Sequence, residues 1–290
     1  MQRSLSNRYV ITTQCEDTIG IVAKISGFLS DAGCTLTEAQ HFNDADEKVS
    51  FVRMVFQAAS GEALCLEELA ADFEQAVARR FRMRIRVREL DRRLRVVIAV
   101  SKQGHCLASL LQRWMNGSIP IDIVAVVSNH QNLRSFVEWH GVKFHYLPIV
   151  AARKLEQERC LNEIFHEAGG ELLVLARYMQ VLSAKACDYF VDRAINIHHS
   201  FLPSFVGSQP YQQAYARGVK LIGATAHYVT AELDEGPIIE QSVERVDHAL
   251  SADQLAVIGS DVECVVLNRA VHWHAECRVF RYGKRTIVLR

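Results

Sequence analysis

Apolar and polar positions in the first 90 residues follow strand-like and helix-like spacings in turn. Apolar residues recur at helical spacing over residues 19–32 and 66–80, and Gly33 stands where a helix often ends in a left-handed glycine. Four β-rich or alternating segments accompany these helices, at residues 9–13, 34–42, 49–56 and 83–90. This order predicts a ferredoxin-like βαββαβ domain, with two helices on one face of an antiparallel sheet.

The pattern changes after residue 94. Residues 94–100, 121–127 and 171–175 are continuous apolar runs, which are typical of buried parallel strands. Helical spacing separates these runs, at residues 106–115, 132–140 and 153–168. Strands that alternate with helices predict an open, mostly parallel, Rossmann-like sheet, in which ligands bind beyond the carboxyl ends of the strands.

The last third of the chain predicts two further strands and a long helix. The strands span residues 223–230 and 237–246, the helix spans residues 252–277, and Gly283 marks a hairpin turn. The predicted fold class is therefore α/β with two domains. We expect a small ferredoxin-like domain at residues 1–88, a charged linker at residues 89–94 and a larger domain at residues 95–290.

Composition narrows the classes of function. Lys plus Arg and Asp plus Glu number 33 each, so the chain lacks the basic excess that is typical of a nucleic-acid-binding protein. The eight cysteines are irregularly spaced without a CxxC pair, which argues against a structural zinc site or a disulfide scaffold. No apolar run is long enough to span a bilayer, and the first residues do not resemble a signal peptide. We therefore expect a soluble cytoplasmic protein without nucleic-acid or membrane partners.

Residues 195–203, with the sequence INIHHSFLP, carry the most informative candidate chemistry. Asn196 and His198 lie two apart at the predicted end of a short strand, so their side chains share one face. An amide donor and an imidazole on one face can together bind a carbonyl oxygen. The alternative is that Asn196 caps a turn and His198 packs in the core. The Ser-Phe-Leu-Pro that follows favours the functional interpretation, because it leaves the strand at once.

A second candidate is the acidic loop at residues 232–237, which contains Asp234 and ends in Gly-Pro. Its alternative is a solvated acidic turn, since spacing alone cannot bring Asp234 to His198. Residues 101–105 follow the first strand of the larger domain and precede a helix, whose N-terminus could hold an anion. His227 lies on a predicted strand and is interpreted as a buried sheet histidine. No dinucleotide, Walker or HExxH motif occurs, and no metal site is expected.

These segments resemble the formyltransferase-fold enzymes. The similar stretches are residues 196–205 (NIHHSFLPSF), 223–229 (GATAHYV) and 233–239 (LDEGPII). Within that superfamily, the doubled His198-His199 resembles the 10-formyltetrahydrofolate deformylases, since glycinamide ribonucleotide formyltransferases usually have Pro at the second position. Residues 17–23 and 31–33 resemble an ACT domain. An ACT domain followed by a formyltransferase-fold domain is the deformylase architecture.

The resemblance implies roles for individual residues. Asn196 and His198 would hold the formyl oxygen, whereas Asp234 would orient and help charge His198 and position the attacking water. The implied substrate-binding residues, most of them around the pterin pocket, are Arg177, Tyr178, Met179, Gln180, Val181, Leu182, His199 and Gly207.

The ACT-like domain implies regulation. The resemblance places a small amino-acid effector between subunits, near Asp17, Gly20 and Gly33. The alternative is a dimerisation module that binds no ligand. In either case we expect a homo-oligomer, a dimer or a tetramer.

The predicted reaction is hydrolysis of 10-formyltetrahydrofolate to formate and tetrahydrofolate, which supplies one-carbon and purine metabolism. The resemblance implies that folate is the substrate. Two donors aimed at the tetrahedral oxyanion suffice for this chemistry without a metal or a covalent nucleophile, so no cofactor is expected. By resemblance, glycinamide ribonucleotide enzymes cradle a substrate phosphate with a Gly-Ser-Asn loop after the first strand. Residues 101–106 here lack the Ser-Asn pair, which favours water as the acceptor.

Three positions depart from a typical deformylase. Gln209 and Gln212 stand where Lys and His are expected, and Ser260 stands where Arg is expected. These changes leave the predicted catalytic residues intact but put the exact substrate in question. Two alternatives therefore remain, a folate-dependent formyltransferase with an amine acceptor and a non-catalytic folate or amino-acid sensor.

Overall fold

The computed structural model of the chain describes residues 7–149, 153–203 and 210–290. Contacts within the chain divide it into two compact units, and the first change of unit follows Arg93. The N-terminal unit also takes in residues 276–280 and 287–290, whereas the larger unit comprises residues 94–275 and 281–286. Both units mix helices with strands, so the predicted α/β fold class is confirmed.

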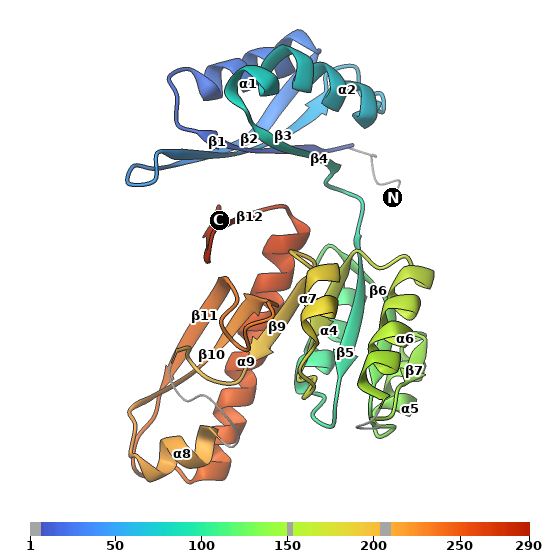
Figure 1. The fold of residues 1–290 in the computed structure, drawn as a ribbon, viewed down its shortest axis with the longest axis vertical. Coiled ribbons are helices and arrows are strands. Elements are labelled where there is room, and N and C mark those ends of the chain that lie inside the picture. The colour runs from blue at the N-terminus through green and yellow to red at the C-terminus, as the bar shows by residue number, and fades with distance from the viewer. Residues whose placement is uncertain (1–6, 150–152, 204–209) are drawn as a thin grey trace. The chain divides into compact units, whose positions relative to one another are not determined.

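The N-terminal unit is a four-stranded antiparallel sheet in the order β2-β3-β1-β4, with helices on one face (Figure 1). Its elements are β1 Tyr9–Glu16, α1 Ile21–Asp31, β2 Cys34–Asp44, β3 Val49–Ala58, α2 Leu66–Phe73, a π-helical stretch Glu74–Ala78, α3 Arg79–Phe81 and β4 Arg84–Glu89. This order agrees with the predicted βαββαβ domain. Gly33 has a φ of +70°, so it follows α1 in the left-handed conformation that favours glycine.

Residues from the end of the chain belong to the N-terminal unit because they pack on its sheet. Nε of Arg53 donates to the carbonyl oxygen of Glu276 over 3.0 Å, and the ring of Phe280 meets Phe51 edge-on at 5.6 Å. The sequence had placed all of residues 95–290 in the larger domain. A short strand at the end of a chain carries no local sign of the sheet that it contacts, so this division differs from the expected one.

The larger unit contains a seven-stranded sheet in the order β11-β10-β9-β8-β5-β6-β7. Neighbours from β9 to β7 run parallel, whereas β10 and β11 are antiparallel. The elements are β5 Leu94–Val100, α4 His105–Met115, β6 Ile121–Ser128, α5 Arg134–Trp139, β7 Phe144–Tyr146, α6 Lys154–Glu167, β8 Leu172–Leu175, α7 Ala184–Tyr189, β9 Ala194–His198, α8 Pro210–Ala216, β10 Leu221–Tyr228, β11 Ile238–Arg245 and α9 Ala252–Ala275. A hairpin of β12 Val279–Tyr282 and β13 Arg285–Val288 follows.

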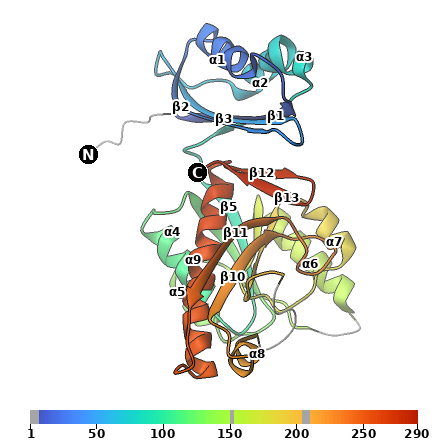
Figure 2. The ribbon, with the colours of Figure 1, turned by 90° about the vertical axis from the view of Figure 1, so that its left-hand side faces the viewer.

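Helices cover both faces of the larger sheet. Helices α6 and α7 pack on one face, and α4 and α9 lie on the other (Figure 2). The sequence did not predict β7, α7 or α8, three short elements of three, six and seven residues. Within the described parts of the chain, no helix is long and apolar enough to cross a membrane.

Two features of this sheet position the functional residues. Strand β5 lies between β6 and β8, so the strands that follow β5 in the chain are added first on one side of it and then on the other. Ligands of such sheets bind beyond the carboxyl ends of the strands at this switch point. In addition, the antiparallel pairing of β9 with β10 sets Asn196 opposite His227 and His198 opposite Thr225.

Candidate active site

The carboxyl end of β9 places Asn196 and His198 in one pocket, as expected of residues two apart on a strand. The pocket has a volume of about 280 Å³. The ring of His198 stacks on that of His199, with centroids 5.0 Å apart. Nε2 of His198 is buried and has no hydrogen-bond partner among the described residues. This nitrogen is therefore the one that a substrate oxygen would meet.

The loop after β10 brings Asp234 to His198. Oδ2 of Asp234 lies 3.2 Å from Nδ1 of His198, and Oδ1 lies 3.7 Å from Nε2 of His227. Gly236 allows this approach, because a Cβ there would lie only 2.9 Å from Nδ1 of His227 and would overlap the carbonyl oxygen of Tyr228. Burial alone would raise the pKa of Asp234, but the hydrogen bond from His198 and the nearness of the His227 imidazole outweigh it and lower that pKa.

His227 is buried on β10, as interpreted from the sequence, but it also lines the pocket. Its Nδ1 donates to the carbonyl oxygen of Tyr228 over 2.9 Å, which leaves Nε2 to accept from Nδ2 of Asn196 at 3.2 Å. Nδ2 of Asn196 carries two hydrogens, so the second one remains for a substrate oxygen. Pairing β9 with β10 in antiparallel register would have predicted this contact, since Asn196 and His227 are direct partners.

The segment after β8 forms a second wall of the pocket. Arg177, Tyr178, Met179, Gln180, Val181 and Leu182 all line it, together with His199. Residues 229–234 line it as well. Gly207, one of the predicted substrate-binding residues, lies outside the described residues. Gln209, one of the three positions that depart from a typical deformylase, also lies outside them. Gln212 is exposed on α8, and the hydroxyl of Ser260 donates to the carbonyl oxygen of Ala256 within α9.

A group of polar side chains around the buried Arg177 and Glu263 adjoins the two stacked histidines, and we call it the Glu263 cluster: Gln103, His105, Arg177, Tyr211 and Glu263. Oε2 of Glu263 accepts from Nε2 of His105 over 2.7 Å and lies 3.5 Å from Nε of Arg177. Oε1 of Glu263 accepts from the hydroxyl of Tyr211 over 2.7 Å. Oε1 of Gln103 accepts from Nε and Nη2 of Arg177 over 2.9 and 2.6 Å.

Glu263 was not among the residues predicted from the sequence. Its signal was a charged residue on an apolar face of a helix, since Val266 and Leu267 follow three and four positions later and are fully buried. Gly259, one turn earlier, makes room for the ring of Tyr211, because a Cβ there would lie 2.1 Å from the Tyr211 hydroxyl.

Electrostatic effects in the cluster set the charges of its members. Burial would raise the pKa of Glu263, but the hydrogen bond from His105 and the charge of Arg177 lower it. Burial lowers the pKa of His199 to about 4, and the charges of Arg177 and His198 act in the same direction. The site therefore contains an ionised Glu263 and a neutral His199 at neutral pH.

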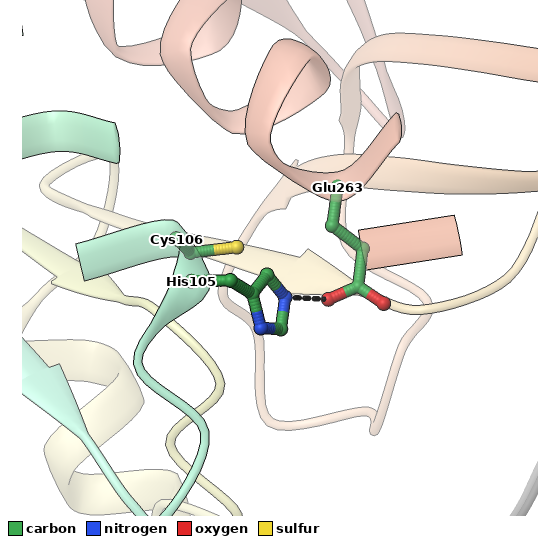
Figure 3. Close-up of side chains that lie close together, drawn as sticks. All are labelled: His105, Cys106 and Glu263. Atoms are coloured by element: carbon green, nitrogen blue, oxygen red, sulfur yellow. Dashed lines mark hydrogen bonds and ion pairs between the residues drawn. The ribbon is translucent and has the colours of Figure 1, made fainter. Parts of the chain in front are cut away.

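Three of these residues have side chains of the kinds that bind metals. The side chains of His105, Cys106 and Glu263 lie close together (Figure 3), and their ligand atoms are within 4.8 Å of one another. A cation there would have to replace the hydrogen bond between His105 and Glu263 and would meet the guanidinium of Arg177, which lies 3.5 Å from the same carboxylate oxygen. The donor set thus fits a metal poorly. Cys106 also hydrogen-bonds to Cys264 and lowers its pKa to about 7, a contact that the irregular cysteine spacing did not predict.

The three predicted effector residues do not meet within one copy of the N-terminal unit. Asp17 and Gly20 lie at the N-terminal end of α1, and Gly33 lies just beyond its C-terminal end. A helix of 11 residues is about 16 Å long, so one small amino acid cannot touch both ends. Oδ1 of Asp17 accepts from Nδ2 of Asn43 over 2.9 Å. The effector site therefore stays a prediction.

Comparison with known proteins settles the family. A family model described as formyl transferase matches residues 94–271. The formyltetrahydrofolate deformylase of Corynebacterium sp. (strain P-1) is 48% identical over 283 residues, which cover 98% of both chains. The chain belongs to the formyltetrahydrofolate deformylase family.

A solved deformylase matches the chain from end to end. The formyltetrahydrofolate deformylase of Burkholderia mallei ATCC 23344 has a TM-score of 0.92 and 48% identity, and the match covers 98% of this chain and 100% of that one. Glycinamide ribonucleotide transformylase 1 from Symbiobacterium toebii has a TM-score of 0.65 and 29% identity, and that match covers 69% of this chain. The resemblance that the doubled histidine suggested is confirmed.

Proposed function

We propose that this chain hydrolyses 10-formyltetrahydrofolate to formate and tetrahydrofolate, the reaction that the name of its relatives describes. One observation carries the proposal: Asn196, His198 and Asp234 come from two separate segments and meet at one pocket. The products supply formate and free folate to one-carbon and purine metabolism. No cofactor is required, since folate is the substrate.

In this proposal the folate ring binds between residues 177–182 and residues 229–234, and the formyl oxygen points toward β9. Nδ2 of Asn196 and Nε2 of His198 donate to that oxygen as the carbonyl carbon becomes tetrahedral. Both donors are held before the substrate arrives, by His227 and Asp234 respectively, so little reorganisation accompanies the reaction.

Water then attacks the formyl carbon while Asp234 accepts one of its protons. The new C–O bond forms, the bond from carbon to the folate nitrogen breaks, and that nitrogen takes up a proton from His198 or from relayed water. Asp234 suits the role of base, because it is ionised in the pocket and already orients His198.

The N-terminal unit is proposed as a regulatory ACT domain that joins copies of the chain into a dimer or tetramer. Its βαββαβ order and the full-length match to a solved deformylase support this role. We further propose a cytoplasmic location and a small amino acid as effector near Asp17, Gly20 or Gly33.

The decisive experiment incubates the full chain with 10-formyltetrahydrofolate without any amine and measures formate and tetrahydrofolate separately. We expect the two products in equal amounts. Release that requires an added amine would support a folate-dependent formyltransferase. Binding without turnover would support a folate sensor, and either result would overturn the proposal.

A further inference from the structure

The switch point of the larger sheet is bridged by two loops of the chain itself. Ligands of open α/β sheets bind in the crevice where the strand order reverses, which here lies beyond β5 and β8. The loop after β5 and the loop after β8 bridge this crevice. The amide of Ser101 donates to the carbonyl oxygen of Arg177, and the hydroxyl of Ser101 accepts from the amide of Met179. The open pocket therefore begins only beside β8 and continues toward β10.

Arg177 is the member of the Glu263 cluster that also lines the pocket. Gln103 accepts two of its hydrogen bonds and Glu263 lies beside it, so the guanidinium is held between the loop after β5 and helix α9. His105 and Tyr211 in turn hold Glu263. Arg177 thus belongs both to the lining of the pocket and to the surroundings of the buried Glu263.

The backbone of Arg177 is a second, independent sign that its side chain is functional. Arg177 has a φ of +62°, a left-handed conformation that is unfavourable for an L-residue and that glycine adopts freely. Strained residues of this kind cluster at functional sites, where the surrounding structure holds them. The strain at Arg177 is offset by the contacts of its guanidinium.

We infer that the Glu263 cluster selects water as the formyl acceptor, because Arg177 fills the space that an amine acceptor would need beside the formyl carbon. This inference rests on the proposed deformylase function. With an amine, the bond from the formyl carbon to the folate nitrogen would break, a bond to the amine nitrogen would form, and the amine proton would pass to the folate nitrogen. Without the Arg177 side chain, Oε2 of Glu263 would face the opened space as an acceptor for the amine N–H groups.

The test measures how the formyl group divides between water and an amine. Wild type, Arg177→Gly and Arg177→Met are each supplied with 10-formyltetrahydrofolate and excess glycinamide, and formate and N-formylglycinamide are measured after subtraction of a protein-free blank. Arg177→Gly opens the space and suits the left-handed backbone, whereas Arg177→Met keeps most of the volume without the charge. We expect the ratio of N-formylglycinamide to formate to rise roughly tenfold or more in Arg177→Gly and to stay near the wild-type value in Arg177→Met.

An unchanged ratio in Arg177→Gly, or an equal rise in Arg177→Met, would overturn the inference. If Arg177→Gly does not fold, Gln103→Ala tests the same idea from the other loop, since it frees Arg177 to move, and a rise of roughly threefold is expected. No rise in that variant would also overturn the inference. Wild-type protein that releases no formate would refute the proposed function itself, whereas normal wild-type hydrolysis with unchanged ratios would refute only the role of the cluster.

Discussion

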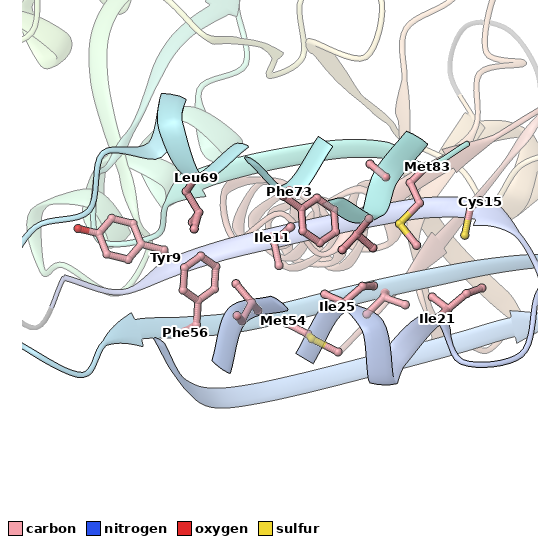
Figure 4. Close-up of a cluster of buried hydrophobic side chains, with 14 residues drawn as sticks. Tyr9, Ile11, Cys15, Ile21, Ile25, Met54, Phe56, Leu69, Phe73 and Met83 are labelled. Carbon is pink, nitrogen blue, oxygen red and sulfur yellow. The ribbon is translucent and has the colours of Figure 1, made fainter. Parts of the chain in front are cut away.

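The core of the N-terminal unit and the carboxyl end of the seven-stranded sheet bury side chains of opposite chemistry. In the core, aromatic and aliphatic side chains such as Phe56 and Phe73 pack between the sheet and the helices (Figure 4). At the carboxyl end of the larger sheet, the buried residues include Arg177, His198 and Glu263. The core of the N-terminal unit is stabilised by apolar contacts that need no particular partner. The carboxyl end of the larger sheet depends on particular partners at hydrogen-bond distance.

The difference shows which substitutions each region tolerates. Apolar burial is non-directional and follows the area removed from water, so a core residue is replaceable by another of similar volume. A buried charge is different, because removing one partner leaves the other group desolvated without compensation. We therefore expect changes in the core to alter stability without altering chemistry, whereas changes at the carboxyl end should alter chemistry and, where they leave a buried charge unpaired, stability as well.

The largest expected effect on stability comes from the core. Phe73→Ala removes a fully buried ring that packs edge-on against Phe28 at 5.1 Å, and it should lower the free energy of unfolding of the N-terminal unit by about 4 kcal/mol. Urea unfolding monitored by circular dichroism measures this loss. Phe42→Ala is the matched control, since Phe42 is 41% exposed, and it should cost much less. Equal losses in the two variants would contradict the assignment of Phe73 to this core.

The largest expected effect on chemistry comes from Asp234. Asp234→Asn keeps the shape of the side chain but removes the charge that faces His198, so kcat should fall on the order of 10³-fold. Formate release under saturating substrate measures the change, and thermal unfolding shows whether the fold persists. Asp192→Asn makes the same chemical change at a residue paired with Arg281, away from the pocket, and should retain near-normal turnover. Near-normal turnover in Asp234→Asn would refute the mechanism.

The Glu263 cluster should show the cost of an unpaired buried charge. Glu263→Ala leaves Arg177 without its carboxylate, and we expect a loss of about 3 kcal/mol in the free energy of unfolding. Glu263→Gln keeps an acceptor for Tyr211 and His105 and should lose less. A rise in KM or a fall in kcat in the Glu263→Gln variant, at nearly unchanged stability, would show that Glu263 positions Arg177 at the wall of the pocket. If Glu263→Ala were as stable as wild type, the carboxyl end would not depend on this particular charged partner, and the contrast with the apolar core would not hold.

An effect of similar size is a dependence of stability on pH at His199. Burial lowers its pKa from the ordinary value of 6.5 to about 4, so the unfolded chain binds more protons than the folded one between these values. Its contribution is present above about pH 6.5, falls as the pH drops, and is lost near pH 4, a loss of about 3 kcal/mol. Comparing His199→Phe with wild type by unfolding at several pH values isolates this slope. A parallel pH dependence in the two proteins would show that His199 is not buried in its neutral form.

Local patterns in the sequence determined the elements and much of the site. The apolar run at residues 94–100 coincides with β5, and the helical spacing at residues 106–115 lies within α4, because periodicity depends only on neighbours along the chain. Asn196 and His198 were predicted to share a face for the same reason, since side chains alternate along a strand. The doubled histidine identified the family. None of these inferences required knowledge of which segments meet in space.

Only the tertiary structure decided which distant groups meet. The 3.2 Å between Asp234 and His198 depends on a loop that passes close to β10 at Gly236, and the position of Glu263 beside Arg177 depends on how α9 packs on the sheet. Residues 276–280 belong to the N-terminal unit for a similar reason, since they pack on its sheet. Contacts of this kind join residues far apart in the chain, so they follow from the packing of whole elements and leave no period or spacing to detect in advance.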